Sequence, residues 1–537
     1  MTSLKSVNVD TDVVIIGGGM SGIGLAVQLM RKFRGATFKI FEKLNDIGGT
    51  WAINTYPGCG VDVPSHFYSY SFAMNPDWSQ KFVMQPELLQ YFHTVARKWN
   101  LAPHTHLEHT VQKAQWDSET STWVVDVFDQ NQNRSFQIRS RALVSAVGAL
   151  SLPKKCDLPG RDEFAGKIFH SALWDHSFDH TGKQVLVLGN GCSATQFVPV
   201  VSETAAKVVQ VVRQPHWLLE RPNPKYSDAF KSIMRHVPGA MKILRGKIYA
   251  ELEAEWLMFD TKTGGRARQK LAEASRAYIK RAAPPRYVDA LMPKFEVGCK
   301  RRVFDTGYLD CLHRDNVELV HDDAVERLTK DSAIFKSGRE IKIDAVILAT
   351  GFETTTLLSH LNIIGRNGVS IHNHWQTHND GLPQAYYGTC VAGFPNFFIM
   401  MGPNTVNGHL SVIFSSECQI NFALNMLEPI LKARQTGAIS AVEVTQDAED
   451  EENSWIQDRA KSLVWSSGCT NWYVEPKSGK NLMVYPEWQW HFWLRSFLVD
   501  HSKFVYTGRD GDPVRLGGLW MACVTGLLGL LAAIHLL

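Results

Sequence analysis

The sequence has 537 residues, of which 45% are hydrophobic and 20% charged, and this length and balance predict a globular protein with several domains. The composition excludes the disordered, collagenous and coiled-coil classes. Because 56 Lys and Arg residues nearly balance 53 Asp and Glu residues, the charge also excludes the basic surface of a typical nucleic-acid-binding protein.

The first predicted structural unit is a strand, a glycine turn and a helix. No apolar stretch of a secretory signal precedes it. Residues 12–16 (DVVII) lead into GGGMSG at residues 17–22 and then into a helical pattern, which is the order of a dinucleotide-binding fold. Gly17 suits a tight turn, Gly19 allows pyrophosphate to approach the backbone, and Gly22 packs the helix on the strand.

A second strand at residues 37–41 is predicted to end at Glu42. A carboxylate at this position accepts hydrogen bonds from the ribose of an adenosine group. With the preceding glycine turn, Glu42 predicts an FAD site.

The same pattern recurs at residues 184–201, where a strand is followed by a GxGxxA turn and a helix. The next strand, residues 207–212, ends at Arg213 instead of an acid. A guanidinium suits the 2′-phosphate of NADPH, because its planar fork binds phosphate oxygens in a bidentate way. The predicted NADPH-binding residues of this unit are Gly189, Asn190, Gly191, Cys192, Ser193, Ala194, Thr195, Gln196, Arg213 and Gln214.

The order of these units predicts an α/β protein with two Rossmann-like domains, the NADPH domain being inserted in the FAD domain. Apolar strands at residues 142–148 and 343–348 are interpreted as strands that return under a dinucleotide. The expected boundaries are residues 1–151 for the first FAD half, 152–340 for the NADPH domain with a helical insert at about 225–283, and 341–505 for the second FAD half.

The C-terminal segment, residues 516–537, contains no Asp, Glu, Lys or Arg and is long enough to cross one bilayer as a helix. It predicts a single-pass transmembrane anchor at the endoplasmic reticulum, with the catalytic domain in the cytosol. Lys503, Arg509 and Arg515 precede it on the side that would stay cytosolic. The alternative is a terminal helix packed on the protein's own surface.

The nine cysteines are scattered and form no CxxC pair, which predicts reduced thiols. The histidines form no recognised ligand motif, so no metal site is predicted. Disulfide reductases share the two-nucleotide arrangement but need a redox cysteine pair, and this chain has Gly48-Gly49-Thr50-Trp51 at the corresponding place.

Two longer motifs identify a family resemblance. Residues 48–62 fit the pattern [AG]GxWxxxx[FY]P[GM]xxxD, which ends at Asp62. Residues 164–175 fit FxGxxxHxxxW followed by Asp, with Phe164, Gly166, His170 and Trp174 at the defining positions. Together they resemble the two fingerprints of type I Baeyer-Villiger monooxygenases, a class of flavoproteins. Residues 471–473 and 485–488 are most similar to fungal members from secondary-metabolite pathways.

The resemblance implies that NADPH reduces FAD and that O₂ supplies one oxygen atom beside the carbonyl of a hydrophobic ketone, giving an ester or lactone. It implies that Arg301, in the segment Cys299-Lys300-Arg301, stabilises an anionic oxidant and that Asp62 orients this arginine. The other implied roles are flavin contact for Thr50, Trp51, Tyr68 and Val111, NADP contact for Lys300 and Trp472, coupling of the domains for His170 and Trp174, and a substrate-pocket loop at residues 401–411.

Two other functions are considered. A flavin monooxygenase that hydroxylates nitrogen or oxygenates sulfur shares many of these motifs, but Trp174 and the Asp62 motif favour the Baeyer-Villiger reaction. A nucleotide-binding membrane protein without turnover would not need Asp62 and Arg301, and both are present.

Overall fold

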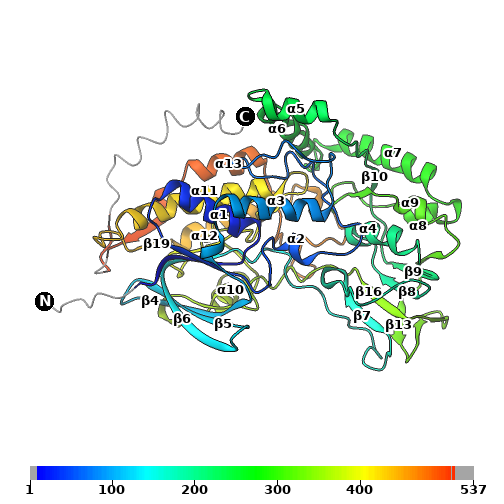
Figure 1. The fold of residues 1–537 in the computed structure, drawn as a ribbon, viewed down its shortest axis with the longest axis horizontal. Coiled ribbons are helices and arrows are strands. Elements are labelled where there is room, and N and C mark those ends of the chain that lie inside the picture. The colour runs from blue at the N-terminus through cyan, green and yellow to red at the C-terminus, as the bar shows by residue number, and fades with distance from the viewer. Residues whose placement is uncertain (1–8, 509–510, 515–537) are drawn as a thin grey trace.

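Two large sheets form the centre of the molecule, which is described here by a computed structural model covering residues 9–508 and 511–514. In Figure 1 the sheet of the predicted FAD domain lies at the lower left and the sheet of the predicted NADPH domain at the lower right. In the same view, helices cover the upper side of both sheets. The motifs of the two predicted nucleotide sites therefore lie on neighbouring sheets.

The larger sheet has eight strands and is organised around β1 (Thr11–Ile16), in which every residue is buried. Such a continuous Val and Ile run is typical of a parallel strand covered on both faces. The strand order is β17 (Asn362–Ile364), β4 (His109–Asp117), β5 (Thr122–Asp129), β6 (Arg134–Ser145), β1, β2 (Phe38–Phe41) and β3 (Thr105–His106), with β18 (Phe397–Ile399) also paired to β6.

The second sheet has five parallel strands and corrects one predicted domain boundary. Its order is β12 (Val317–His321), β9 (Lys207–Val212), β8 (Gln184–Leu188), β16 (Ala345–Leu348) and β7 (Lys167–His170). The sequence analysis assigned residues 343–348 to the second FAD half, but β16 pairs with β7 and β8. A short buried apolar run does not indicate which sheet it joins, so the boundary moves from residue 340 to the end of β16.

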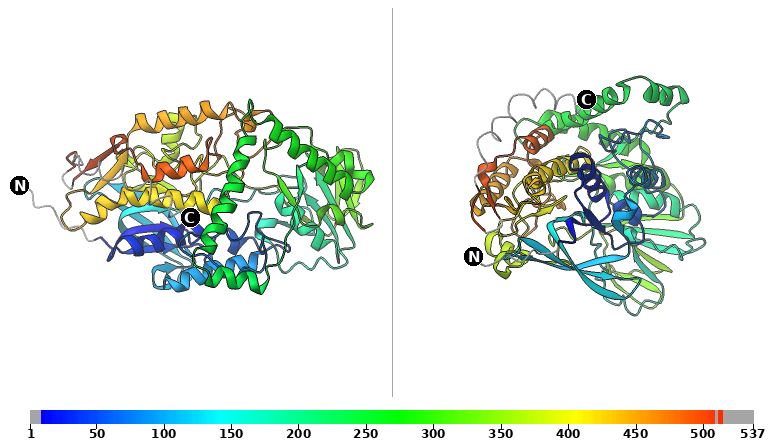
Figure 2. Two further views of the ribbon diagram at one scale, coloured as in Figure 1. Left: turned by 90° about the horizontal axis from the view of Figure 1, so that it is seen from above. Right: turned by 60° about the vertical axis from the view of Figure 1, so that its left-hand side comes forward.

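The helices of the FAD domain pack on its sheet. The 21-residue helix α11 (Val412–Lys432) is mostly buried and contacts α1 (Met20–Lys32) and α13 (Gln489–Phe497), as Figure 2 shows. The other α-helices outside the helical insert are α2 (Thr50–Ile53), α3 (Gln85–Lys98), α4 (Cys192–Val201), α8 (Val288–Leu291), α9 (Tyr308–Cys311), α10 (Ile371–Asn379) and α12 (Gln446–Ala460).

The helical insert predicted at about residues 225–283 is present as α5 (Asp228–His236), α6 (Ala240–Glu253), the short 3₁₀ turn η3 (Ala254–Met258) and α7 (Gly265–Ala282). It runs along the upper right of Figure 1. Arg245 of α6 is buried and donates hydrogen bonds to the backbone oxygen of His66 at 2.6 Å and to Ser69 Oγ at 2.9 Å. The insert is therefore fastened to the FAD domain.

The remaining described strands form three small sheets. They are β10 (Leu218–Glu220) with β11 (Val303–Asp305), the antiparallel set β13 (Val325–Leu328), β14 (Ser332–Phe335) and β15 (Glu340–Lys342), and the pair β19 (Ala441–Val444) with β20 (Phe504–Thr507).

The prediction that all cysteines are reduced thiols is wrong for one pair. Cys299 and Cys469 form a disulfide with a Cα–Cα distance of 6.2 Å and a sequence separation of 170 residues. Spacing along the chain does not predict this bond, because only tertiary folding brings the two loops together. The six other described cysteines are free, and Cys523 lies outside the described residues.

Loss of this disulfide is expected to lower the stability of the protein. A crosslink that closes a long loop restricts the unfolded chain, and its removal costs about 2 to 4 kcal/mol. Cys469→Ser should therefore melt at a lower temperature than the oxidised protein in differential scanning fluorimetry. Cys156→Ser, which changes a free cysteine, is the control. Equal melting of oxidised and dithiothreitol-reduced protein would contradict this prediction.

The predicted fold class also needs a correction, because it included a transmembrane helix. Among residues 9–508 and 511–514, no helix has both the length and the apolar character needed to cross a bilayer. The longest described helix, α11, is buried against other helices and contains Glu417 and Glu428. The predicted anchor, residues 516–537, lies outside the described residues. We therefore withdraw the transmembrane helix, the membrane partner and the endoplasmic reticulum location, and retain a two-domain α/β fold.

Candidate active site

The first glycine turn is a tight backbone turn that requires glycine at two positions. Gly17 has a φ of +107°, and a Cβ there would lie 2.6 Å from the carbonyl oxygen of Ala146. A Cβ on Gly22 would lie 2.0 Å from the oxygen of Gly17. Gly19 faces Gly49, whose Cα would be 3.4 Å from an added Cβ. The start of α1 follows this turn, and the N-terminus of a helix suits the pyrophosphate of FAD.

Glu42 lies at the end of β2, beside this turn, as predicted. Its carboxylate accepts hydrogen bonds from the backbone N–H groups of Gly18 at 2.7 Å and Leu44 at 2.9 Å. Both carboxylate oxygens are thus oriented by the backbone at the position expected for ribose binding. Val111, another predicted flavin contact, has its side chain buried in the core with Phe41, so only its backbone is available to a ligand.

The first fingerprint packs directly on the glycine turn. The backbone N–H of Gly48 donates to the oxygen of Gly18 at 2.9 Å, and the exposed Thr50 begins α2. Trp51 Nε1 donates to Tyr68 Oη at 3.3 Å, and the two buried rings meet edge to face. Burial raises the pKa of Tyr68, so its hydroxyl stays protonated.

The second glycine turn is open where a ligand is expected. A Cβ on Gly189 would lie 2.4 Å from the oxygen of Ala349, whereas a Cβ on Gly191 would meet no atom within 4 Å. Asn190 Nδ2 donates to the backbone oxygen of Gln214 at 2.9 Å, which holds the turn beside the end of β9. The turn continues through Cys192, Ser193 and Ala194 into α4, whose N-terminal N–H groups suit an anion.

Gln196 has a role that the sequence analysis did not assign. Its Oε1 accepts from Tyr56 Oη at 3.0 Å, and its Nε2 donates to the backbone oxygen of Gly60 at 3.1 Å. A Cβ on Gly58 would lie 2.3 Å from the backbone oxygen of Gln196. The side chain therefore joins α4 to the first fingerprint instead of pointing freely to a ligand. The neighbouring Thr195 is also buried, and its hydroxyl donates to the oxygen of Cys192 at 3.1 Å.

Asp62 and Arg301 form the central ion pair of the site. Arg301 Nη2 and Nε lie 2.7 and 2.8 Å from Asp62 Oδ2. Burial disfavours the charge of the guanidinium, but Asp62, together with Tyr473 and Cys192, more than offsets this effect and the pKa of Arg301 is raised. Asp62 and Arg301 also influence the thiol of Cys192, whose pKa is raised to about 11 chiefly by burial. The ion pair is therefore close to the second glycine turn.

Tyr473 is a neighbour of Arg301 that the sequence analysis missed. It is 1% exposed, and burial raises its pKa to about 12 although the charge of Arg301 opposes the shift. The adjacent Trp472 is partly buried, with its ring centroid 4.6 Å from that of Tyr473. No local motif marks Tyr473, because its proximity to Arg301 depends on a contact between segments 172 residues apart, from 301 to 473.

Lys300 and Arg213 form a second cationic group at the end of β9. Burial and the nearby charge of Arg213 lower the pKa of Lys300 to about 8. Lys300 Nζ donates to Gln214 Oε1 at 3.4 Å and lies 4.5 Å from the ring centroid of Phe295. Within the described chain, neither cation has a carboxylate within ion-pair distance. Two like charges held together in this way favour a bound anion.

The second fingerprint packs between the two domains. Gly166 is required because a Cβ would lie 2.3 Å from the oxygen of Asp344 and 2.6 Å from the ring of Phe164. His170 ends β7, and its Nδ1 accepts from the backbone N–H of Ala172 at 3.1 Å. Burial lowers the pKa of His170. The ring of Trp174 lies 5.4 Å from that of Phe197 in α4, measured between centroids.

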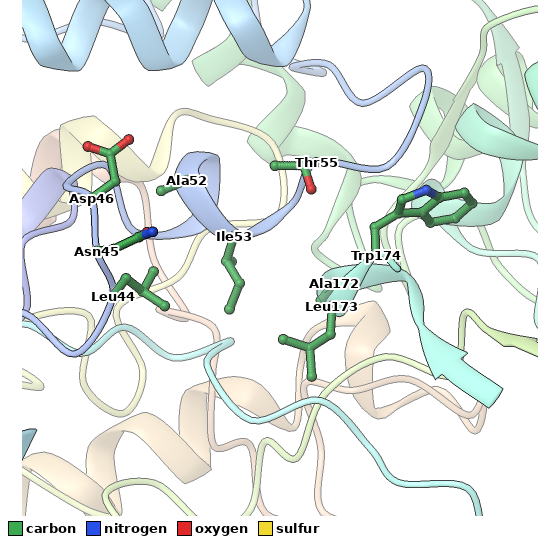
Figure 3. Close-up of a pocket in the computed structure, with 9 residues that line it drawn as sticks. All are labelled: Leu44, Asn45, Asp46, Ala52, Ile53, Thr55, Ala172, Leu173 and Trp174. Carbon is green, nitrogen blue, oxygen red and sulfur yellow. The ribbon is translucent and has the colours of Figure 1, made fainter. Parts of the chain in front are cut away.

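A cavity of about 190 Å³ separates the two fingerprints, as Figure 3 shows. The segment after β2 and helix α2 form one side, and residues 172–174 form the other. Trp174 therefore contacts α4 of the NADPH domain and lines a space next to the first fingerprint. Its lining residues are Leu44, Asn45, Asp46, Ala52, Ile53, Thr55, Ala172, Leu173 and Trp174.

Comparisons with known proteins agree with this geometry. Residues 10–234 match the family described as flavin-binding monooxygenase-like. A Baeyer-Villiger monooxygenase of Pseudomonas aeruginosa is 36% identical, and the alignment covers 92% of this chain and 91% of that protein. The chain belongs to the Baeyer-Villiger monooxygenase family. An FAD-binding monooxygenase of Aspergillus niger is 34% identical, with coverage of 86% of this chain and 76% of that protein.

Solved structures of family members have the same architecture. A steroid monooxygenase bound to NADP is 27% identical with a TM-score of 0.78, over 92% of this chain and 99% of that one. A complex of the enzyme OTEMO with FAD and NADP is 25% identical with a TM-score of 0.79, over 93% of this chain and the whole of that one. This Baeyer-Villiger family member is thus an NADPH-dependent flavin monooxygenase with FAD and NADP as cofactors.

Proposed function

We propose that the enzyme inserts one oxygen atom of O₂ beside the carbonyl of a hydrophobic ketone, in the natural-product metabolism of a fungus. The observation that carries this proposal is the ion pair between Asp62 and Arg301, which joins the first fingerprint to the segment beside the second glycine turn. Similarity to an FAD-binding monooxygenase of Aspergillus niger supports the fungal part of this proposal.

The two glycine turns would hold the cofactors. Gly17, Gly19 and Gly22 give the FAD pyrophosphate a cradle, and Glu42 is oriented for the ribose. When bound, FAD accepts hydride from NADPH and activates O₂. Gly191 leaves the corresponding space open at the second turn.

Arg301 would stabilise negative charge on the reacting oxygen atoms. Its raised pKa keeps the guanidinium charged throughout turnover, and Asp62 fixes its orientation. A fixed cation in a partly buried site stabilises developing charge more strongly than water does. Asp62 also limits the net positive charge, so the site does not bind anions indiscriminately.

The substrate is proposed to be hydrophobic because aromatic side chains surround the segment before Arg301. Phe259 lies against Gly298, where an added Cβ would be 3.2 Å from its ring. Trp256, Trp465 and Tyr473 belong to the same buried cluster. Such a wall favours an apolar ligand body with few polar groups.

The test is product analysis with the full-length holoenzyme, NADPH and O₂. Cyclic and aryl ketones, tertiary amines and thioethers are offered separately, and products are identified by mass spectrometry. Lactones or esters from the ketones are expected. Oxygenation of amines or thioethers alone would contradict the proposal and favour an N-hydroxylase or S-oxygenase.

The efficiency with NADPH is expected to fall as the pH rises through about 8. Lys300 is charged below its pKa of about 8 and neutral above it, so its attraction for the 2′-phosphate is lost at high pH. kcat/KM for NADPH should decrease about tenfold between pH 7 and pH 9.5. Lys300→Arg should flatten the profile, because arginine stays charged. An unchanged profile in this variant would contradict the assignment.

A further inference from the structure

A buried polar cluster lies between the helical insert and the second FAD half, away from the ion pair described above. Glu253, the last residue of α6, is 5% exposed. Its Oε2 accepts from His409 Nε2 at 3.0 Å, and its Oε1 accepts from the backbone N–H of Trp490 at 3.1 Å. Both carboxylate oxygens therefore act as acceptors, as expected for an ionised group.

His409 has one ring nitrogen without a partner. Its side chain is fully buried, and among residues 9–508 and 511–514 Nδ1 has no hydrogen-bond partner, although Nε2 is bonded to Glu253. Because a carboxylate only accepts, Nε2 carries a proton and Nδ1 is the free position. A buried polar atom without a partner costs free energy, which indicates that another group completes this site.

Two further side chains belong to this cluster, and one of them has a polar atom without a hydrogen-bond partner among the described residues. Gln489 is fully buried, and its Oε1 accepts from Ser415 Oγ at 3.1 Å while Nε2 has no partner. Tyr249 lies one turn before Glu253, and its hydroxyl interacts with that carboxylate. Burial raises the pKa of Tyr249, and the charge of Glu253 adds to the shift. Its hydroxyl is therefore a neutral donor beside the same carboxylate.

Only one aromatic ring separates His409 from the segment that carries Arg301. The ring centroid of Phe259 lies 5.5 Å from that of His409. An added Cβ would lie 3.1 Å from the Phe259 ring at Gly408 and 3.2 Å from it at Gly298. Glycine at both positions lets the backbone contact this ring closely. The Phe259 ring therefore contacts both the loop that carries His409 and the segment before Arg301, and a ligand that spans this distance would be elongated and largely apolar.

We propose that His409, oriented by Glu253, binds a hydroxyl group at the far end of the ketone substrate. The inference rests on the proposed function, because the ketone end is assigned to Arg301. A hydroxyl both donates and accepts, so it satisfies Nδ1 whether the imidazole is neutral or protonated. A carboxylate would be repelled by Glu253, and a carbonyl or ether could not donate to a neutral Nδ1. The substrate class is thus a hydroxylated hydrophobic ketone.

The experiment compares the binding of ketones that differ by one hydroxyl. The probes are 4-(4-hydroxyphenyl)cyclohexanone against 4-phenylcyclohexanone and, as a longer pair, estrone against 3-deoxyestrone. Each is titrated into oxidised full-length holoenzyme saturated with NADP⁺, and Kd is taken from the change in flavin absorbance. The hydroxylated member of at least one pair should bind about tenfold more tightly. This measurement needs no turnover, so failure to oxygenate ketones would contradict only the proposed function.

Two variants test His409 itself, and a third variant is their control. His409→Gln keeps a donor for Glu253 but removes the Nδ1 acceptor, and it should abolish the hydroxyl preference. His409→Asn keeps a polar atom near the Nδ1 position and should retain part of the preference. His236→Gln, on the exposed surface of α5, is the control and should behave as wild type.

The proposal is overturned if wild type shows no preference in either pair, whether the probes bind equally or not at all. That result would mean that ordered water completes the cluster. It is also overturned if His409→Gln keeps the full preference. The wild-type comparison holds even if a variant fails to retain flavin.

Discussion

Arg301→Ala is expected to lower the rate of ketone oxygenation by about 100- to 1,000-fold, because it removes the fixed positive charge at the reacting oxygen atoms. NADPH oxidation should continue, with its electrons released as hydrogen peroxide instead of reaching a product. The measurement pairs lactone formation by mass spectrometry with NADPH consumption and peroxide production. A variant that couples NADPH oxidation to lactone as well as wild type does would contradict the assigned role of Arg301.

Further variants separate the effect of the positive charge of Arg301 from the effect of its geometry. Arg301→Lys keeps a cation but loses the two contacts with Asp62 Oδ2, so a smaller loss is expected. Asp62→Asn keeps the size of the side chain and removes its charge, and it should also uncouple the enzyme. Arg266→Ala changes an exposed arginine of α7 and should behave as wild type.

Arg213→Ala is expected to raise KM for NADPH by about 100-fold and to leave KM for NADH within about twofold of wild type. Arg213 is exposed at the end of β9, close enough for its charge to lower the pKa of Lys300. Its free guanidinium is available to the 2′-phosphate, which NADH lacks. Steady-state kinetics with the two cofactors measures the change in preference.

The Arg213→Ala variant also allows a second, independent measurement, the pH dependence of kcat/KM for NADPH. Without the charge of Arg213, the pKa of Lys300 should rise, because one cause of its depression has been removed. The alkaline fall in kcat/KM for NADPH should then move to higher pH. An equal rise in KM for NADH, or an alkaline limb that stays at pH 8, would indicate that Arg213 acts on the fold and not on the phosphate. Arg327→Ala, on an exposed strand position, is the control.

Two side chains connect the two domains close to the glycine turns. Gln196 joins α4 to Tyr56 and Gly60 of the first fingerprint, and Trp174 packs on Phe197 of α4. A shift of the NADPH domain would therefore move residues next to the flavin site. The family resemblance implies that the second fingerprint couples the two domains, and these contacts are of the kind that such coupling requires.

The two glycine turns could be predicted from the sequence because each is local. The strand, glycine turn and helix around Gly17 and Gly189 follow one another without interruption, and the backbone conformation at both positions requires glycine. Glu42 and Arg213 each end the next strand, so their places follow from chain order alone. The helical insert was equally predictable from its periodic pattern.

Only the tertiary structure determined which distant segments meet. β16 could have joined either sheet on its apolar pattern, and its pairing with β7 and β8 moved a domain boundary. The Cys299–Cys469 disulfide and the buried contact between Glu253 and His409 join residues 170 and 156 positions apart. Sequence patterns record the periodicity of a helix or strand, whereas such contacts depend on how complete elements pack, which no local spacing encodes.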